Sequence, residues 1–410
     1  MHAPVPPRAD IRFGEFVTLI ALLMAVPALG IDIMLPVLPD IASAYAVASA
    51  NDRQLVVTAY MLGFAAGQPF YGPMSDRFGR KPMMTLGLLV FAAGAAGALV
   101  APDYTMLLAA RVLQGLGAAA MRVITVTVVR DRFAGREMAR VMSFIILVFI
   151  LVPMLAPSLG GLIAHQGGWP WIFGFLLLSS AASLAWMLTR LPETLRPEDR
   201  LPLEASAIAG AVTTVATTRE ALGYTVAGGF MFGGIMSYVG SSQQIFVDTY
   251  GLGELFPVVF GGLAGVMALA SLTNAALVGR LGMRRVSHGA LLLFLAACGV
   301  MGAMGFPAQP PLWALLSFLA VAFYCTGLTM PNFNSIAMQP VGHIAGTASS
   351  FMGFYSTAAG ALGGWAIGQA FDGTVRPLFL GYTALGLLTL LTILVTERWR
   401  LMQPHEQPKA

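Results

Sequence analysis

Long apolar runs alternate with short polar segments along almost the whole chain. Each run is close to the length of about 20 residues that an α-helix needs to cross the hydrocarbon core of a bilayer. Charged residues, glycines and prolines separate the runs, so the pattern predicts twelve transmembrane helices and an all-α membrane fold. The expected spans are 16–38, 54–73, 83–101, 104–129, 138–164, 169–189, 221–244, 255–279, 287–305, 311–332, 344–369 and 375–396.

The composition excludes most other classes of protein. Of 410 residues, 57% are hydrophobic and only 10% are charged, whereas a soluble domain carries about 25% charged residues. The chain therefore has too few charges to cover a water-facing surface, which excludes disordered, nucleic-acid-binding and ordinary cytosolic-enzyme classes. Two cysteines and five scattered histidines predict neither a disulfide framework nor a metal site. No phosphate-binding loop is present, so we expect no nucleotide cofactor and no enzyme activity.

The distribution of positive charge predicts the orientation. With the N-terminus inside, the inward segments hold 19 of the 23 lysines and arginines and the outward segments hold two, Arg53 and Arg376. The remaining two, Arg111 and Arg122, fall inside a span. Positive residues gather on the cytoplasmic side of membrane proteins, so both termini are expected there.

The chain divides near its middle into two similar halves. Residues 190–220 contain several prolines and charges and are interpreted as a cytoplasmic linker between bundles at 1–189 and 221–410. The segment at 76–81, DRFGRK, is partly repeated 203 residues later as GRLGMR. Two parallel six-helix repeats are typical of transporters that carry their site between the halves.

Two ionisable residues lie at matching depths in the first and fourth spans. Asp32 and Arg111 are each about seven residues, or about 10 Å, from the outer ends of their spans. Ionisable residues inside a membrane usually lie on ion or substrate pathways. We therefore expect Asp32 to pair with Arg111 and to take up and release a proton during transport. The alternative is a static ion pair that fixes the register of the helices.

The fourth span carries a second arginine on the same helical face. Arg122 follows Arg111 by eleven residues, so Gln114, Ala118 and Arg122 continue the stripe toward the cytoplasm. This stripe either lines a central cavity or ends in an arginine that reaches the inner interface with its long side chain.

The loop between the second and third spans combines glycines with opposite charges. Gly72 permits close helix packing and Gly79 permits a tight turn. We expect Asp76 to accept hydrogen bonds from backbone N–H groups at a nearby helix N-terminus. Arg77 and Arg80 can pair with acidic groups or lipid headgroups. A plain cationic anchor would explain these arginines but not Asp76 or the two glycines.

The fifth span has two prolines followed by a pair of glycines. Pro153 and Pro157 each remove a backbone donor and favour a kink. Gly160 and Gly161 allow another helix to approach closely. The cluster is interpreted either as a hinge or as a simple packing seam.

Several aromatic and amide side chains are candidates for contact with a transported molecule. Aromatic rings give adaptable apolar contacts, although such residues also serve as lipid contacts, packing residues or helix caps. The candidates are Tyr60, Phe64, Tyr238, Gln243, Gln244 and Asn332.

Several of these segments resemble motifs of one family. The decapeptide at 72–81 resembles the loop between helices two and three of the major facilitator superfamily. Residues 111–115, RVLQG, resemble its fourth-helix RxxQG motif, and residues 156–161, APSLGG, resemble the GPxxGG motif of its drug/proton antiporters, with Ala156 in place of glycine. The segments 31–36, 129–131 and 192–195 further resemble the bicyclomycin/chloramphenicol-resistance branch of multidrug efflux proteins.

The resemblance implies a proton-driven exporter of amphipathic compounds. It implies that Asp32 and Arg111 couple protons to transport and that Asp76, Arg77 and Arg80 form a cytoplasmic gate. It also implies that Pro157, Gly160 and Gly161 form a hinge or a tight packing contact in the fifth span. The expected setting is the bacterial inner membrane, with a small-molecule substrate, protons and lipid as partners and a monomeric state. Two alternatives stay open: a proton-linked transporter of a single metabolite on the same fold, and a membrane receptor that transports nothing.

Overall fold

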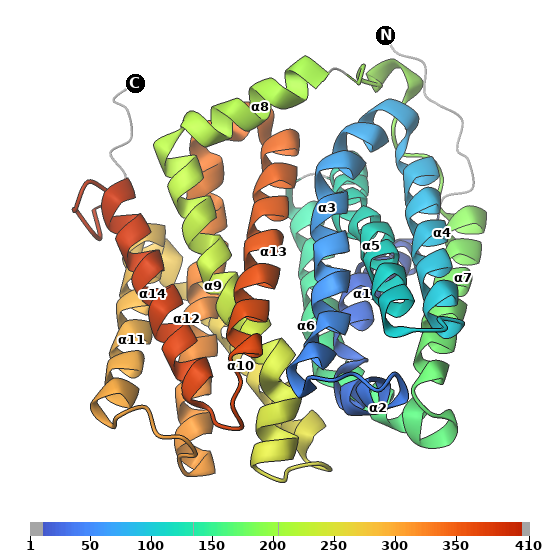
Figure 1. Cartoon of the computed structure of the whole chain (residues 1–410). Helices are drawn as coiled ribbons and strands as arrows, with labels where there is room; N and C mark the ends of the chain where they lie inside the picture. Colours follow the sequence, from blue (N-terminus) through green and yellow to red (C-terminus); the bar gives the residue numbers. More distant parts are fainter. Residues whose placement is uncertain (1–10, 134, 204, 404–410) are drawn as a thin grey trace.

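The computed structural model describes residues 11–133, 135–203 and 205–403. Within this part of the chain, twelve α-helices have 20 residues or more and stand side by side in two bundles (Figure 1). The helices of the first bundle are α1 Phe13–Asp32, α3 Leu55–Phe78, α4 Arg80–Leu99, α5 Tyr104–Arg132, α6 Gly135–Gly167 and α7 Pro170–Arg190. Those of the second bundle are α9 Arg219–Gln243, α10 Phe256–Leu281, α11 Met283–Ala303, α12 Leu312–Met338, α13 Ala345–Gln369 and α14 Arg376–Thr396. The predicted all-α membrane fold is confirmed.

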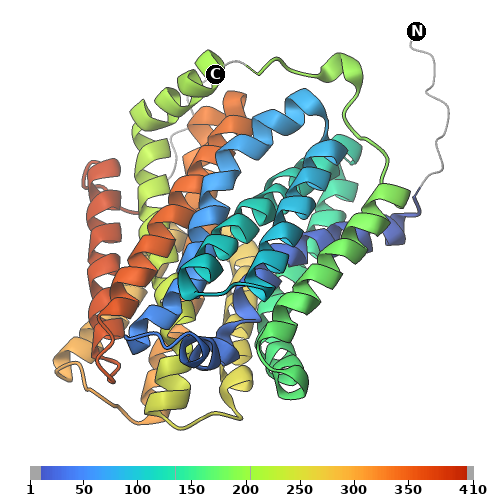
Figure 2. The ribbon, with the colours of Figure 1, turned by 45° about the vertical axis from the view of Figure 1, so that its right-hand side comes forward.

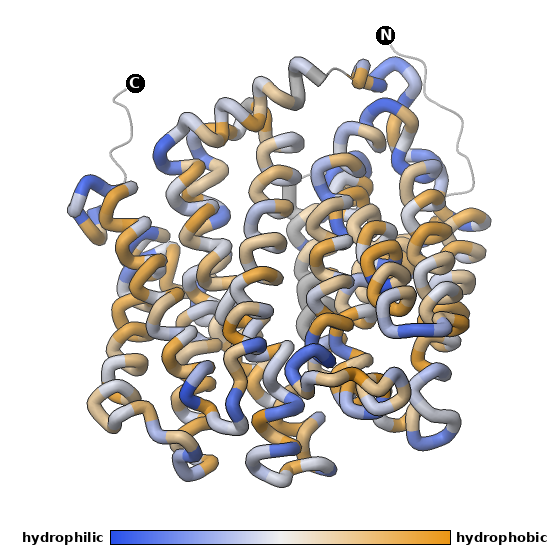
Figure 3. Tube along the Cα trace, viewed as in Figure 1, coloured by the Kyte–Doolittle hydropathy of each residue, from blue (hydrophilic) through white to orange (hydrophobic). Residues whose placement is uncertain are grey.

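The surface of this bundle pair suits lipid rather than water. Among the described residues, nine helices are long and apolar enough to cross a membrane. Leu178, Leu272 and Trp313 are each at least 70% exposed, a placement that is favourable against acyl chains. Hydrophilic residues gather at the two ends of the helices (Figure 3). The chain is thus a multi-pass membrane protein.

We call the two ends of the molecule the linker side and the far side. The linker side carries α8, Ala205–Thr217, which lies across the end of the second bundle (Figure 1). The far side carries the short helices α2, Leu38–Ala44, and η2, Ala50–Gln54, together with η4, Gln244–Thr249, a π-helical continuation of α9. The segment expected to be a linker therefore contains a helix of 13 residues, and the domain boundaries at 189 and 221 stay a prediction.

The halves meet along two pairs of helices. Helix α3 packs against α13, and α6 packs against α10; Figure 2 shows the first pair crossing the middle of the molecule. These pairs leave α1 and α9 facing the interior on opposite sides of the boundary, with η1, Leu35–Val37, in contact with α9.

A glycine with positive φ separates helices two and three of each half. Gly79 (φ 105°) lies between α3 and α4, and Gly282 (φ 81°) lies between α10 and α11. Residues with a Cβ seldom adopt this conformation, so these glycines allow a sharp reversal between two long helices. Their spacing of 203 residues equals that of the repeat in the sequence.

The first predicted span was too long. The pattern predicted one helix over 16–38, but α1 ends at Asp32 and is followed by a turn, η1 and α2. The prolines at 36 and 39 lack the backbone N–H that a continuous helix needs. As a result, the carbonyl of Leu29 still accepts from the N–H of Ile33, but the carbonyls after it are left without helical donors.

Candidate functional site

Asp32 occupies the broken end of α1, inside the first bundle. It is 5% exposed, and it is the only acidic residue in the described ranges that is less than a tenth exposed. A carboxylate buried to this extent requires nearby donors or cations. Its position therefore marks a site where a charge has to be stabilised by the surrounding protein.

Arg111 binds the end of α1 rather than the carboxylate of Asp32. Its Nη2 donates to the carbonyl of Gly30 at 2.7 Å, its Nε donates to the carbonyl of Val56 at 3.1 Å, and its Nη1 donates to Gln114. In the part of the chain that the structure describes, no ion pair joins Arg111 to Asp32, so the predicted direct pair is wrong. The reason is the break in α1: a cation is stabilised at a helix C-terminus, where last-turn carbonyls lack partners.

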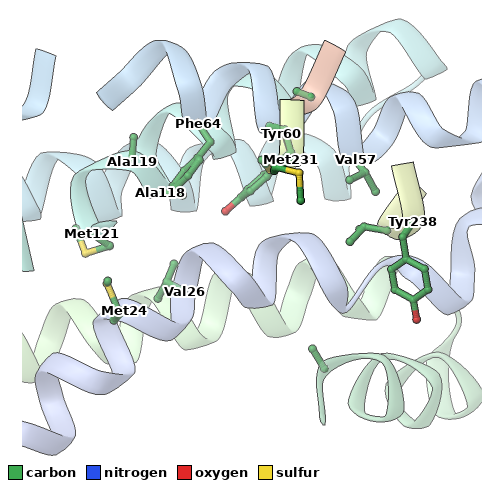
Figure 4. Packing of buried hydrophobic residues seen from close by; sticks show 14 of the residues in the cluster. Met24, Val26, Val57, Tyr60, Phe64, Ala118, Ala119, Met121, Met231 and Tyr238 are labelled. Atoms are coloured by element: carbon green, nitrogen blue, oxygen red, sulfur yellow. The ribbon is translucent and has the colours of Figure 1, made fainter. Parts of the chain in front are cut away.

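Tyr60 completes the surroundings of this arginine. The guanidinium carbon of Arg111 lies 4.5 Å from the centre of the Tyr60 ring, and the Tyr60 hydroxyl donates to the carbonyl of Pro27 at 3.0 Å. Phe64 stacks with Tyr60 at a ring distance of 6.4 Å. Tyr60 is fully buried and Phe64 nearly so, so both support α1 and Arg111 in this structure, and their contact with a substrate stays a prediction (Figure 4).

The stripe on α5 changes from buried to exposed toward the linker side. Gln114 and Ala118 are fully buried, whereas Arg122 is exposed. Thr125, which lies on the same face one turn later, is again buried. The structure thus separates Arg122 from the buried part of the stripe, and its place on a cavity or at the inner interface stays a prediction.

The proline and glycine cluster of α6 lies directly against the end of α1. A methyl group at Gly160 would overlap the carbonyl oxygen of Ile33, the residue after Asp32, whereas a methyl group at Gly161 would meet nothing within 4 Å. The expected close approach is therefore made by Gly160 and not by Gly161. Pro153 and Pro157 lie within the unbroken α6 helix, and their action as a hinge stays a prediction.

On the linker side, Arg80 gathers the polar groups of the loop between α3 and α4. Its Nε donates to Asp131 at 3.0 Å, and its Nη1 donates to the hydroxyl of Ser75 at 2.8 Å and to Asp76. Arg80 is 6% exposed, so the charge is enclosed by these partners. Arg77 is exposed.

Glu193 is a functional residue that the sequence did not single out for this role. Its carboxylate accepts from the backbone N–H of Arg80 at 3.0 Å and of Lys81 at 3.1 Å, at the start of α4. The prediction gave a helix-capping role to Asp76, but Asp76 binds the Arg80 side chain, and Glu193 caps the helix. A Cβ at Gly79 would lie 2.6 Å from Glu193 Oε2, so the glycine is what admits the carboxylate. The sequence signal for this capping role is an acidic residue just after the sixth span.

The second half has a related arrangement at the same end. Glu397 follows the last span as Glu193 follows the sixth, and it accepts from Arg284 Nε at 2.8 Å and from the Tyr224 hydroxyl at 2.6 Å. Arg284 also binds Glu220 at 2.9 Å. Each half therefore ties its last helix to the start of its third helix on the linker side.

On the far side, polar side chains join the two halves directly. Arg53 and Gln54 of the first half bind Asp248 and Gln244 of the second half. Asn51 accepts from Gln244 Nε2 at 2.8 Å. Asn51 also donates to the carbonyls of Gln369 at 3.0 Å and Phe371 at 2.8 Å. We call Asn51, Arg53, Gln54, Gln244 and Asp248 the far-side lock, because their bonds close this end of the boundary.

The remaining substrate candidates divide between three places. Gln244 belongs to the far-side lock, and Gln243 is buried beside it, with its Nε2 3.3 Å from Asp248. Asn332 is buried within the second half and donates to Asn274 at 2.7 Å. Tyr238 is buried on α9, the helix that contacts η1 of the first half. The structure thus does not bring the predicted substrate residues together in one cavity.

In the described ranges, no three His, Cys, Asp or Glu side chains are grouped as metal ligands would be. The described residues offer a buried acid at the end of α1 and separate polar clusters on the linker side and the far side.

Comparisons with known proteins agree with this architecture. Residues 20–364 match the model of the Major Facilitator Superfamily. An uncharacterised transporter of this superfamily from Bacillus subtilis is 32% identical over 82% of this chain and 84% of its own. A bicyclomycin resistance protein homolog from Haemophilus influenzae is 31% identical over 92% of this chain and 94% of its own.

A solved structure shares the fold at low sequence identity. The human organic anion transporter MFSD10 is 20% identical, with a TM-score of 0.66 over 92% of this chain and 98% of its own. The similarity in fold and the family match confirm the resemblance seen in the sequence motifs. The chain belongs to the major facilitator superfamily, among relatives named for drug resistance.

Proposed function

We propose that this protein exports amphipathic drugs or related small molecules in exchange for protons, by alternating access. The observation that carries the proposal is Asp32, the buried acid at the broken end of α1. Placing a titratable group at this depth costs free energy, and intramembrane acids usually lie on proton or substrate pathways. The relatives named for bicyclomycin and chloramphenicol resistance support drugs as the substrate class.

The two ends of the boundary supply the gates in this proposal. The linker side, which holds most of the positive residues, is assigned to the cytoplasm of a bacterial inner membrane. The far-side lock is then the outer gate, closed in this structure, and the Arg80 cluster belongs to the inner gate. Arg122, exposed on the inward face of α5, lies on the route from the cytoplasm to Asp32.

Arg111 acts by fixing the geometry of the acid. Its bonds to the carbonyls of Gly30 and Val56 hold the end of α1 against α3 and α5. A proton from outside neutralises Asp32, and its release toward the cytoplasm accompanies the binding of substrate. The halves then rock about the α3–α13 and α6–α10 contacts.

The test uses everted membrane vesicles with an acidic interior and a fluorescent drug outside. The wild type should accumulate the drug as the gradient dissipates, and Asp32→Asn should insert normally but lose gradient-driven accumulation. Asp40→Asn makes the same chemical change at an exposed acid of α2 and should transport as the wild type does. Accumulation by Asp32→Asn at the wild-type rate would contradict the proposal.

A panel of neutral, cationic and anionic compounds in the same vesicles defines the substrate class. Export of several unrelated amphipathic compounds supports the proposal. Gradient-driven movement of one metabolite only, with no drug accumulated, would replace it with a single-substrate transporter.

A further inference from the structure

Tyr238 of α9 carries a hydroxyl that is buried without a partner. The residue is 1% exposed, and within the described part of the chain its hydroxyl makes no hydrogen bond. Buried polar groups in native proteins are nearly always paired, so an orphaned one calls for an explanation. A partner acquired in another state of the protein is one such explanation.

The position of this hydroxyl is fixed by an aromatic cluster. The Tyr238 ring stacks on Phe260 at a ring distance of 5.4 Å and meets the edges of Phe323 at 4.7 Å and Phe246 at 6.2 Å. These contacts hold the ring on three sides. The packing of the ring therefore fixes the direction in which the hydroxyl points.

Tyr238 lies on the helix of the second half that meets the end of α1. Helix α9 contacts η1, the segment that follows Asp32 after a short turn. Figure 4 shows the Tyr238 ring beside the ribbon of α1. The acid belongs to the first half and the tyrosine to the second.

Other donors near Asp32 hold the end of α1 in place. The titratable groups around the acid are Tyr60 from α3, Arg111 from α5 and Tyr238 from α9, while α6 presents Gly160 there. The Tyr60 hydroxyl donates to a carbonyl of α1, and three of the five N–H groups of the Arg111 guanidinium donate to the acceptors named above. Of the two tyrosine hydroxyls in this group, that of Tyr238 has no acceptor.

We propose that Tyr238 is the positioning residue of proton coupling, whose hydroxyl donates a hydrogen bond to the Asp32 carboxylate once that acid has released its proton. This inference rests on the proposed function. Tyr238 keeps its own proton throughout, and the proton from Asp32 leaves to water on the linker side. Hydrogen bonds to a charged acceptor are markedly stronger than those to a neutral one, so the bond between the halves strengthens on deprotonation and weakens on protonation.

The same helix connects this bond to the far-side lock. Helix α9 continues from Tyr238 to Gln243 and passes directly into η4, which carries Gln244 and Asp248. A displacement of Tyr238 toward Asp32 therefore moves the segment that holds the second half's part of the lock. The protonation state of one acid is in this way transmitted to the gate at the far side.

The experiment compares Tyr238→Phe with a matched control in vesicles that carry an imposed proton gradient. Tyr71→Phe removes the hydroxyl of another buried tyrosine, on α3 of the first half. We expect Tyr238→Phe to lower kcat about tenfold with KM changed less than about twofold, and to move the pH profile of transport by about one pH unit toward alkaline values. Tyr71→Phe should leave both quantities at wild-type values.

The thermal midpoint of the purified variants separates coupling from structure. Removal of an unpartnered hydroxyl from an aromatic cluster should leave the midpoint of Tyr238→Phe unchanged or raise it. A pH profile and kcat equal to those of Tyr71→Phe would overturn the inference, while loss of transport in Asp32→Asn would still support the proposed function. An Asp32→Asn variant that transports normally would instead overturn the function itself.

Discussion

The far-side lock predicts a measurable shift between the closed and open states of the outer gate. Asn51 is the residue to change, because its side chain makes three hydrogen bonds, each to the other half. A net contribution of about 0.5–1 kcal/mol for each bond of a half-buried side chain gives about 1.5–3 kcal/mol in total. Since about 1.4 kcal/mol corresponds to a factor of ten, Asn51→Ala should increase the ratio of open to closed molecules by about 10- to 100-fold.

Spin labels at Ala48→Cys and Glu254→Cys report this ratio through their distance distribution. Both positions are exposed on the far side, one in each half, and the two native cysteines are buried. Asn51→Ala should add or enlarge a long-distance population in the absence of substrate. Thr374→Ala is the matched control, because its hydroxyl binds Asp372 within its own half. A distribution for Asn51→Ala that matches that of Thr374→Ala would refute the assignment of the lock as the outer gate.

Two further changes test the packing around Asp32 and the linker side. Gly160→Ala should abolish transport because its methyl group would overlap the Ile33 carbonyl, whereas Gly161→Ala meets open space and should transport normally; equal rates in the vesicle assay would show that the close approach has no role. Glu193→Ala should lower the free energy of unfolding by about 1–2 kcal/mol because two N–H groups at the start of α4 lose their cap. A decrease in thermal midpoint of a few degrees checks this, and a midpoint equal to that of the wild type would argue against the cap.

The arrangement of long helices could be predicted because the bilayer leaves few alternatives. Backbone N–H and C=O groups in lipid must form their hydrogen bonds within the helix itself. The length and the apolar pattern of a segment are therefore enough to locate a span. The exception is the end of α1, where the apolar run continues past Asp32 but the helix does not. Prolines beyond Asp32 mark the break, although a hydropathy pattern does not register them.

The partners within the site could not be predicted to the same extent. Matching depth placed Arg111 beside Asp32, but depth does not say whether a guanidinium binds the side chain or the carbonyls of a broken helix. Glu193 lies more than 100 residues from the helix that it caps, and the far-side lock joins loops that no periodicity connects. Tyr238 was predicted as a substrate contact because of its aromatic ring. The absence of a hydrogen-bond partner for its buried hydroxyl can be seen only in the three-dimensional structure.

Proton release on drug binding is the measurement that tests the central claim most directly. Purified protein in weakly buffered detergent solution, with a pH-sensitive dye, is mixed with a drug that the vesicle assay has identified. The wild type and Asp40→Asn should acidify the solution in proportion to the drug bound, and Asp32→Asn should bind drug without acidification. Equal acidification by Asp32→Asn would show that the exchanged proton resides elsewhere.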